Sequence, residues 1–196
     1  MGIDNSWFAR GFRATPFMAI LRGLGPQRTL DLARQAWAGG IDLVEVPVQR
    51  PGDLEVLSAL AREADRLGRH VGAGTVLTVD QLDAVRRAGA RFIVSPGLDR
   101  TLVAHAAESG IPALPGVGTA TEVNEAMKLG LTWLKAFPAA SLGSSWISQL
   151  RGPFPDAHFV ATGGMNLDNA QAFLDAGAKG VAIGSAVERF VRSRPQ

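Results

Sequence analysis

Eight short apolar runs recur along the chain at intervals of roughly 20 to 27 residues. They cover residues 16–23, 43–48, 70–76, 91–97, 112–117, 132–137, 158–164 and 180–185. Most of the segments between them show the 3.6-residue period of amphipathic helices. In one of these segments Leu30, Ala33 and Trp37 share a stripe that ends at two glycines. Strands that alternate with helices predict a parallel sheet with helices outside it.

Eight strand–helix units close most simply into a (β/α)8 TIM barrel, and this compact α/β fold is the one we predict. We expect one domain over residues 1–196, with the barrel in 16–190 and a short N-terminal helix or arm in 1–15 that covers the barrel bottom. The alternative is an open doubly wound sheet. The sequence disfavours it, because HVGAGTV (70–76) lacks the third glycine of a dinucleotide-binding fingerprint and no acidic residue stands out at the expected later position.

Composition excludes several classes of protein. The chain has no cysteine, which removes disulfides, thiolate catalysis and cysteine-bound zinc. No apolar run reaches the roughly 18 residues of a membrane span, and the N-terminus lacks the apolar core of a signal peptide. We therefore expect a cytoplasmic protein with no membrane partner. Its formal net charge is only +2 and its arginines are dispersed, so no nucleic-acid partner is predicted.

Lys135 stands inside the apolar run TWLKAF, which predicts a buried strand. The two other lysines, Lys128 and Lys179, lie in polar helix-end or loop contexts. Burial disfavours the ammonium form and lowers the pKa of a lysine, and a neutral amine is a nucleophile suited to Schiff-base chemistry on a carbonyl. Lys135 is therefore the candidate nucleophile. The alternative is a structural lysine that is paired inside the barrel.

Other polar residues interrupt the apolar runs near the ends of the predicted strands, where the chemistry of a (β/α)8 barrel takes place. Glu45 lies between valines, so its carboxylate is either a general acid/base with a raised pKa or one half of a structural ion pair with Lys135 or Arg22. Arg22 ends the first run, where an arginine can also extend to water. Thr75 is near the end of the third run, where it can also be an ordinary β-branched strand residue.

Two glycine-rich turns follow the last two predicted strands. Gly163 and Gly164 lie in ATGGMN, and Gly184 and Ser185 lie in AIGSAVERF. Glycine lets the backbone approach an anion closely, and the start of a following helix presents free N–H groups. Because phosphate sites of this fold commonly use the loops after strands 7 and 8, the two turns together predict a phosphate site. Either turn alone reads equally well as a simple tight turn.

The three histidines do not predict a metal site. His70 and His158 begin their strands at the opposite end of the barrel, and His105 lies in a helix, so the three side chains are not expected to converge. We therefore predict that the protein binds no metal. No other cofactor is expected either, because a Schiff-base lysine carries the covalent step itself.

An ordered set of motifs resembles the class I aldolases that cleave 2-keto-3-deoxy-6-phosphogluconate (KDPG) or its galactonate epimer (KDPGal). The motifs are ILRG (20–23), VEVPV (44–48), GAGTVL (72–77), SPG (95–97), PGVGTATE (115–122), LKAFPA (134–139), TGG (162–164) and IGS (183–185). The resemblance implies a carbon–carbon lyase of carbohydrate metabolism, in the Entner–Doudoroff or galactonate pathway. It implies that the substrate is a phosphorylated keto sugar acid, that the products are pyruvate and glyceraldehyde 3-phosphate, and that the protein is a homotrimer.

The resemblance also implies a role for each matching residue. Lys135 corresponds to the Schiff-base lysine and Glu45 to the carboxylate that transfers protons. Arg22 and Thr75 correspond to residues that bind the carboxylate of the keto acid. The pocket walls correspond to Pro96 and Phe137, and the phosphate cradle to Gly163, Gly164, Gly184 and Ser185.

One position departs from the KDPG pattern. Many KDPG-type members have an arginine four residues after the glutamate, where this chain has Gln49 followed by Arg50. The segment looks closer to the KDPGal pattern, whereas SPG looks more like KDPG, so either epimer remains possible. We count Gln49 as a pocket residue. Two other functions stay open: cleavage of the unphosphorylated 4-hydroxy-2-oxoglutarate, and a phosphate-binding barrel without lyase activity, such as an isomerase or a sensor.

Overall fold

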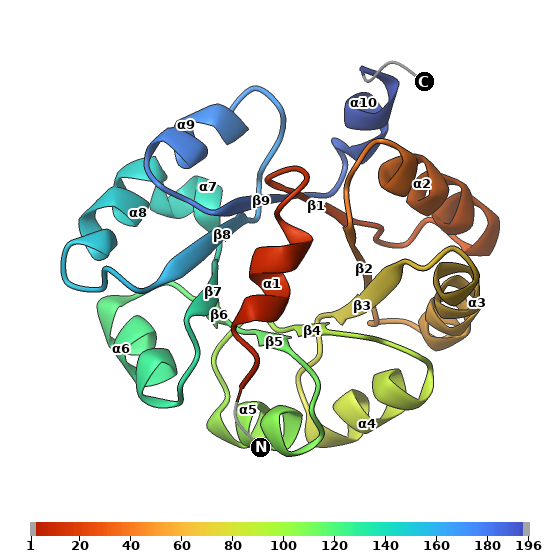
Figure 1. Cartoon of the computed structure of the whole chain (residues 1–196), viewed down its shortest axis with the longest axis horizontal. Helices are drawn as coiled ribbons and strands as arrows, with labels where there is room; N and C mark the ends of the chain where they lie inside the picture. The colour runs from red at the N-terminus through yellow and green to blue at the C-terminus, as the bar shows by residue number, and fades with distance from the viewer. Residues whose placement is uncertain (1–2, 194–196) are drawn as a thin grey trace.

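A ring of parallel strands surrounded by helices makes up the computed structural model, which describes residues 3–193 (Figure 1). The strands are β1 Phe17–Ile20, β2 Leu43–Pro47, β3 His70–Gly74, β4 Ile93–Val94, β5 Ala113–Leu114, β6 Gly116–Val117, β7 Trp133–Ala136, β8 His158–Thr162 and β9 Gly180–Ile183. The helices are α1 Ser6–Gly11, α2 Pro26–Ala38, α3 Asp53–Arg66, α4 Val79–Arg87, α5 Arg100–Glu108, α6 Ala120–Lys128, α7 Ala139–Leu142, α8 Ser144–Arg151, α9 Ala170–Asp175 and α10 Val187–Arg192. The predicted TIM-barrel fold is confirmed.

The fifth apolar run forms two very short strands, β5 and β6, on either side of Pro115. Proline has no backbone N–H to donate, so the strand ladder is interrupted there. The strands pair in the order β5-β4-β3-β2-β1-β9-β8-β7-β6, which leaves β5 and β6 at the two ends of the sheet. Because these two strands are consecutive in the chain, Pro115 itself joins the ends of the sheet into a ring. The Pro115 carbonyl still accepts a hydrogen bond from Lys135 N at 2.9 Å.

Alternate residues of each strand face the barrel interior or the surrounding helices. In β7, Leu134 belongs to the hydrophobic layer between strands and helices, whereas Trp133 belongs to a second cluster inside the barrel. In β2, Val44 and Leu43 divide between the two layers in the same way. This alternation places Lys135 and Glu45, each two residues further along its strand, inside the barrel.

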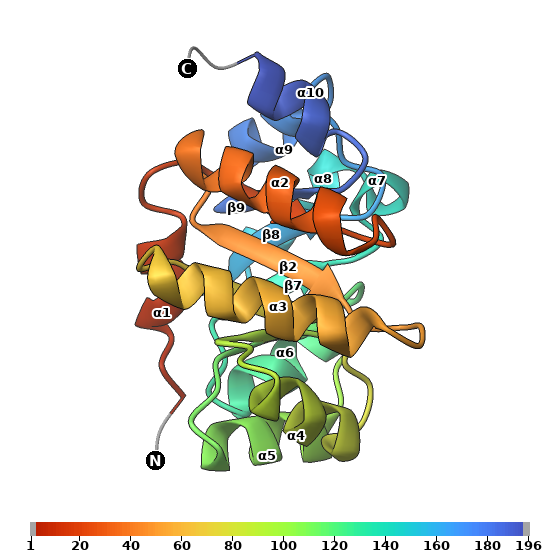
Figure 2. The same cartoon turned by 90° about the vertical axis from the view of Figure 1, so that its right-hand side faces the viewer.

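Helix α1 lies across the N-terminal end of the barrel, as predicted for a covering segment (Figure 1). Phe8 and Phe12 enter the interior cluster, where Phe12 stacks on Trp133 with ring centroids 5.5 Å apart. Phe8 also meets the Phe92 ring edge to face, at 5.8 Å. These aromatic side chains fill the barrel bottom. Figure 2 shows β2 running away from α1, so the carboxyl ends of the strands open on the opposite side.

Several helix boundaries follow from local side-chain chemistry. Thr78, the N-cap of α4, accepts a hydrogen bond from Gln81 N, and Thr119 forms a capping box with Glu122 at the start of α6. Helix α9 begins only at Ala170, after the turn NLDN (166–169). Asn166 and Asn169 bond each other's backbone N–H groups there, which gives the chain an alternative to the first helical turn.

Candidate active site

A cavity of about 780 Å³ opens at the carboxyl ends of the strands. Its lining includes every site residue predicted from the sequence except the buried Glu45: Arg22, Gln49, Thr75, Pro96, Lys135, Phe137, Gly163, Gly164, Gly184 and Ser185. The closed strand ring brings these residues together from seven separate segments of the chain. Charged residues are few in the lining: only Arg22, Lys135 and Glu188 carry charge.

Lys135 projects from β7 into the barrel and is only 6% exposed. Its Nζ lies 4.6 Å from the centroid of the ring of Phe137, which follows the last residue of β7. Burial lowers the pKa of the Lys135 ammonium; the Glu45 carboxylate opposes this effect and the Arg22 guanidinium adds to it. The neutral, nucleophilic form of the amine is therefore more populated than that of a lysine in water.

Glu45 is the most deeply buried acidic side chain of the site, at 1% exposure. Burial raises the pKa of its carboxyl group, while the charges of Lys135 and Arg22 lower it. Among residues 3–193, Oε2 has no hydrogen-bond partner and Glu45 forms no ion pair within 4.0 Å. A direct structural salt bridge with Lys135 or Arg22 is therefore not formed. The carboxyl group is held close enough to Lys135 for their charges to interact, with a polar atom left free to bind a proton or a water.

Glycine at position 74 gives the Glu45 carboxylate its space. The end of β3 lies beside β2, and a Cβ atom at residue 74 would overlap Oε1 of Glu45. Thr75, the next residue, has a φ of 58°, which is an outlier for a β-branched side chain. Strained backbone of this kind concentrates at functional sites, and here it turns Thr75 into the cavity wall.

Arg22 and Gln49 meet at the mouth of the cavity. Nη1 of Arg22 donates a hydrogen bond to Oε1 of Gln49. Arg50 does not line the cavity; its guanidinium instead lies by Gly23, with Nη1 3.4 Å from the position of a Cβ there. Gln49, and not Arg50, therefore occupies the pocket position at which the sequence departs from the KDPG pattern.

The two glycine-rich turns lie together on one side of the cavity. Gly163 and Gly164 have φ values of 94° and 72°, which favour glycine, and a Cβ at Gly164 would lie 2.6 Å from Ala140 Cβ. Among the described residues, the backbone N–H groups of Gly164 and Ser185 have no backbone acceptor. Helix α10 starts two residues after Ser185, whereas five residues separate Gly164 from α9. The turns thus offer backbone donors without a lysine or arginine from the same loops.

Sequence reasoning missed part of the lining. The cavity wall around the first glycine turn also includes Thr162, Met165 and Asn166. Glu188 lines the cavity as well and forms an ion pair with Arg28. Thr162 could have been noticed as a hydroxyl inside an apolar run. The position of Glu188 depends on how α10 packs beside α2, which no local pattern reveals.

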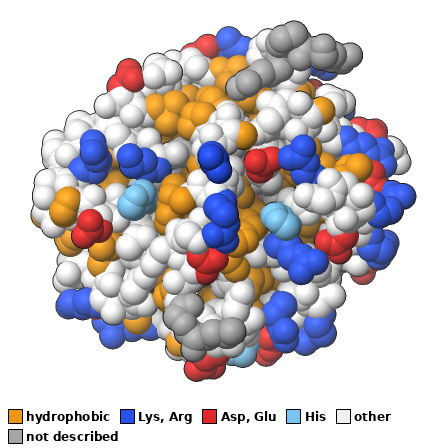
Figure 3. Space-filling model, viewed as in Figure 1, with side chains coloured by type: hydrophobic (Ala, Val, Ile, Leu, Met, Phe, Trp, Pro, Cys, Tyr) orange, Lys and Arg blue, Asp and Glu red, His pale blue; other side chains and the backbone are white. Residues whose placement is uncertain are grey.

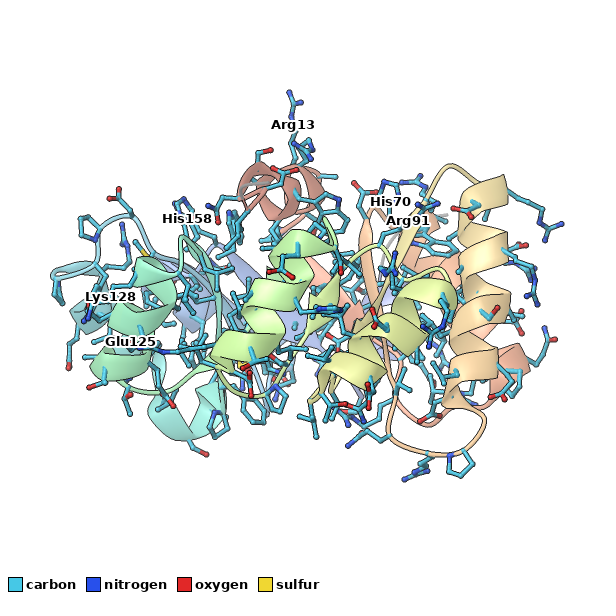
Figure 4. All side chains as sticks on the ribbon, turned by 90° about the horizontal axis from the view of Figure 1, so that it is seen from below. Arg13, His70, Arg91, Glu125, Lys128 and His158 are labelled. Atoms are coloured by element: carbon cyan, nitrogen blue, oxygen red, sulfur yellow. The ribbon has the colours of Figure 1, made fainter. Side chains whose placement is uncertain are left out.

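At the end of the barrel covered by α1, a smaller cavity of about 340 Å³ has Arg10, Asp42 and His70 in its lining. His70 and His158 lie on that side, and Arg13 points away from the molecule (Figure 4). Basic side chains on this face are dispersed among acidic and neutral ones (Figure 3). Within residues 3–193, no group of three or more potential ligand side chains could hold a metal ion, and no helix has the length and apolarity needed to cross a membrane.

Comparisons with known proteins place this chain among aldolases. A family model described as KDPG and KHG aldolase matches residues 9–192. The 2-dehydro-3-deoxy-phosphogluconate aldolase of Treponema pallidum is 41% identical over 145 residues, which are 73% of this chain and 68% of the relative. The 2-dehydro-3-deoxy-6-phosphogalactonate aldolase of Escherichia coli K12 is 34% identical over 181 residues, 91% of this chain and 87% of that protein.

A solved structure adds chemical detail. KDPG aldolase from Legionella pneumophila, with pyruvate captured at low pH as a covalent carbinolamine intermediate, superposes with a TM-score of 0.82. It is 33% identical, and the match covers 92% of this chain and 88% of that one.

Proposed function

The chain belongs to the KDPG and KHG aldolase family, and we propose that Lys135 is the residue that forms the Schiff base. The protein is a class I aldolase, a carbon–carbon lyase that cleaves 2-dehydro-3-deoxy-6-phosphogluconate or -galactonate to pyruvate and D-glyceraldehyde 3-phosphate. The observation that carries the proposal is the burial of Lys135 beside Glu45 on the floor of a cavity with two glycine turns on its wall.

In the proposed mechanism, the neutral amine of Lys135 attacks the C2 ketone of the substrate. The resulting carbinolamine loses water and becomes an iminium ion, which can accept an electron pair. Glu45, directly or through a water, takes the proton of the C4 hydroxyl. The C3–C4 bond then breaks, its electrons form an enamine on Lys135, and glyceraldehyde 3-phosphate is released. Protonation at C3 and hydrolysis of the iminium free pyruvate and regenerate the amine.

The pKa of each group suits its proposed part. Burial lowers the pKa of Lys135, which supplies the unprotonated nucleophile, and raises that of Glu45, which moves the carboxyl toward the range in which it can both give and take a proton. The lysine carries the covalent step itself, so the proposed reaction needs no cofactor.

We assign the two ends of the substrate by charge and hydrogen-bonding capacity. The C1 carboxylate is next to the reacting ketone, so it is expected at Arg22 and Thr75, with Pro96 and Phe137 flanking the reacting carbons. The phosphate lies several bonds away and is expected at the backbone donors of the glycine turns, 163–164 and 184–185. Comparing kcat/KM for the phosphorylated substrates and for 4-hydroxy-2-oxoglutarate would measure what the phosphate contributes.

The decisive experiment is borohydride reduction in the presence of pyruvate, followed by peptide mass spectrometry. A pyruvate adduct on Lys135 is expected in the wild type, and no adduct or turnover in Lys135→Met. An adduct on another residue, or turnover by the folded variant, would contradict the assignment. Binding of phosphate without any pyruvate adduct would instead support a non-lyase barrel. The homotrimer and the cytoplasmic location stay predictions.

A further inference from the structure

Gln49 is the only hydrogen-bond partner found for the Arg22 side chain within residues 3–193. Both residues line the cavity, and both are largely exposed at its mouth. An exposed arginine on a flexible stem ordinarily samples many rotamers, and ordering such a side chain on binding reduces affinity. A partner that orders Arg22 before the substrate arrives removes part of that cost.

The chemistry of the contact fixes how the Gln49 amide is oriented. A guanidinium has donors only, so the group that it meets must be the carbonyl oxygen of the glutamine. The amide nitrogen, which carries two hydrogens, is therefore the atom of the amide that does not accept from Arg22. No acceptor for Nε2 of Gln49 is found in the described part of the chain, so its donors are available to an oxygen of a ligand.

The backbone of Gln49 is itself fixed. Oδ2 of Asp53, the first residue of α3, accepts hydrogen bonds from the N–H of Gln49 at 2.9 Å and of Arg50 at 2.7 Å. These bonds anchor the loop after β2 to a 14-residue helix. Arg22 is thus connected to a rigid element through Gln49.

We propose, on the basis of the function above, that Gln49 is a positioning and specificity-determining residue for the C1 carboxylate of the substrate. Its carbonyl oxygen holds the Arg22 guanidinium toward the cavity, and its amide nitrogen donates a further hydrogen bond to the same carboxylate. The carboxylate is then bound by one cation and neutral donors. An arginine at position 49 would instead add a second positive charge and could not accept a hydrogen bond from Arg22.

The test compares Gln49→Met, which keeps the length of the side chain but can neither accept from Arg22 nor donate, with Gln49→Glu, which still accepts from Arg22 but replaces the amide donor with a negative charge. Gln149→Met, on α8 and outside the cavity, is the matched control. We expect Gln49→Met to raise KM for the keto acid about tenfold with kcat within about twofold, because the lost interactions are equally present in ground and transition states. Gln49→Glu should raise KM further, and the control should leave it unchanged.

A double-mutant cycle with Arg22→Met separates positioning from an independent contact. If Gln49 acts largely through Arg22, the double variant should have a KM close to that of Arg22→Met alone. An unchanged KM in Gln49→Met, fully additive effects, or Gln49→Glu equal to wild type would each overturn the proposal. Borohydride trapping at saturating pyruvate should label Lys135 in the wild type and in every variant at position 49. Loss of that label in the wild type would instead reject the proposed function.

Discussion

The carboxylate of Glu45 occupies the space into which any side chain at Gly74 would have to grow. The two residues lie on adjacent strands, β2 and β3, where Gly74 pairs with Pro47, two residues beyond Glu45. The two residues are far apart in the sequence, yet the Glu45 carboxylate, the proposed proton carrier, can take its position only because residue 74 has no Cβ atom. Gly74 is therefore expected to matter for catalysis although it has no chemistry of its own.

Gly74→Ala should lower kcat by roughly 100-fold or more, the scale of losing a general acid/base, because the new methyl group displaces the Glu45 carboxylate. Steady-state kinetics would measure the loss, with circular dichroism to establish that the variant is folded. Gly152→Ala is the control. Gly152 is the C-cap residue of α8, and the nearest atom to a Cβ there is the Gln149 carbonyl oxygen, at an ordinary contact distance of 3.5 Å. Adding Glu45→Gln to Gly74→Ala should cost little more; full additivity would show that the two residues act separately.

Removing each neighbouring charge should move the pKa of Lys135 in opposite directions. The Glu45 carboxylate raises that pKa and the Arg22 guanidinium lowers it, on top of the larger lowering by burial. Glu45→Gln therefore lowers the pKa further, and Arg22→Met raises it. The pH at which cyanoborohydride traps half of the maximum pyruvate adduct, at saturating pyruvate, should shift down in the first variant and up in the second. Shifts in the same direction would refute this electrostatic account.

The backbone strain at Thr75 should be separable from the function of its hydroxyl group. Thr75→Gly removes a strain of about 1–3 kcal/mol, offset by about 0.5–1 kcal/mol of glycine entropy, so the free energy of unfolding should rise by about 1 kcal/mol. Thr75→Val keeps the strain. Both variants should raise KM for the keto acid, since both lack the hydroxyl. Denaturant melts and kinetics measure the two effects, and a destabilised Thr75→Gly would show that the residue is not strained.

The aromatic bottom of the barrel should contribute to stability and not to catalysis. Phe8→Ala deletes a side chain that is buried against Phe92 and Trp133, and should lower the free energy of unfolding by roughly 3–5 kcal/mol. Because this cluster lies at the end opposite the cavity, kcat/KM measured well below the melting temperature should be unchanged. Arg13→Ala, whose side chain points into solvent (Figure 4), should affect neither quantity.

The architecture could be predicted because it depends on patterns that repeat along the chain. Eight apolar runs and the helices between them are enough to indicate a barrel, and a barrel places the ends of its strands together. The split at Pro115 was missed, although proline's missing N–H was a signal for it. The start of α9 at Ala170 could not be predicted from apolar periodicity, because the hydrogen bonds of Asn166 and Asn169 determine it.

The site residues could be named from the sequence, but their relationships could not. Whether Gln49 or Arg50 faces the cavity depends on how the loop after β2 turns, and Asp53 determines that turn through two hydrogen bonds. The space that Gly74 leaves for the Glu45 carboxylate depends on the register of β2 against β3. Both are contacts between segments that are distant or irregular, so local periodicity carries no information about them.

The packed aromatic rings fill the barrel below the cavity, so the buried Lys135 lies deep in the cavity and the more exposed glycine turns lie nearer its mouth. The order in which the two products leave is then expected to follow their depth in the cavity. With the Schiff base on Lys135 as proposed, the phosphate-bearing three-carbon fragment is expected to leave first, and the pyruvate fragment to stay bound to Lys135 until a water molecule hydrolyses the iminium. Under the proposed mechanism, the shape of the cavity therefore favours the same order of product release as the bond-breaking chemistry.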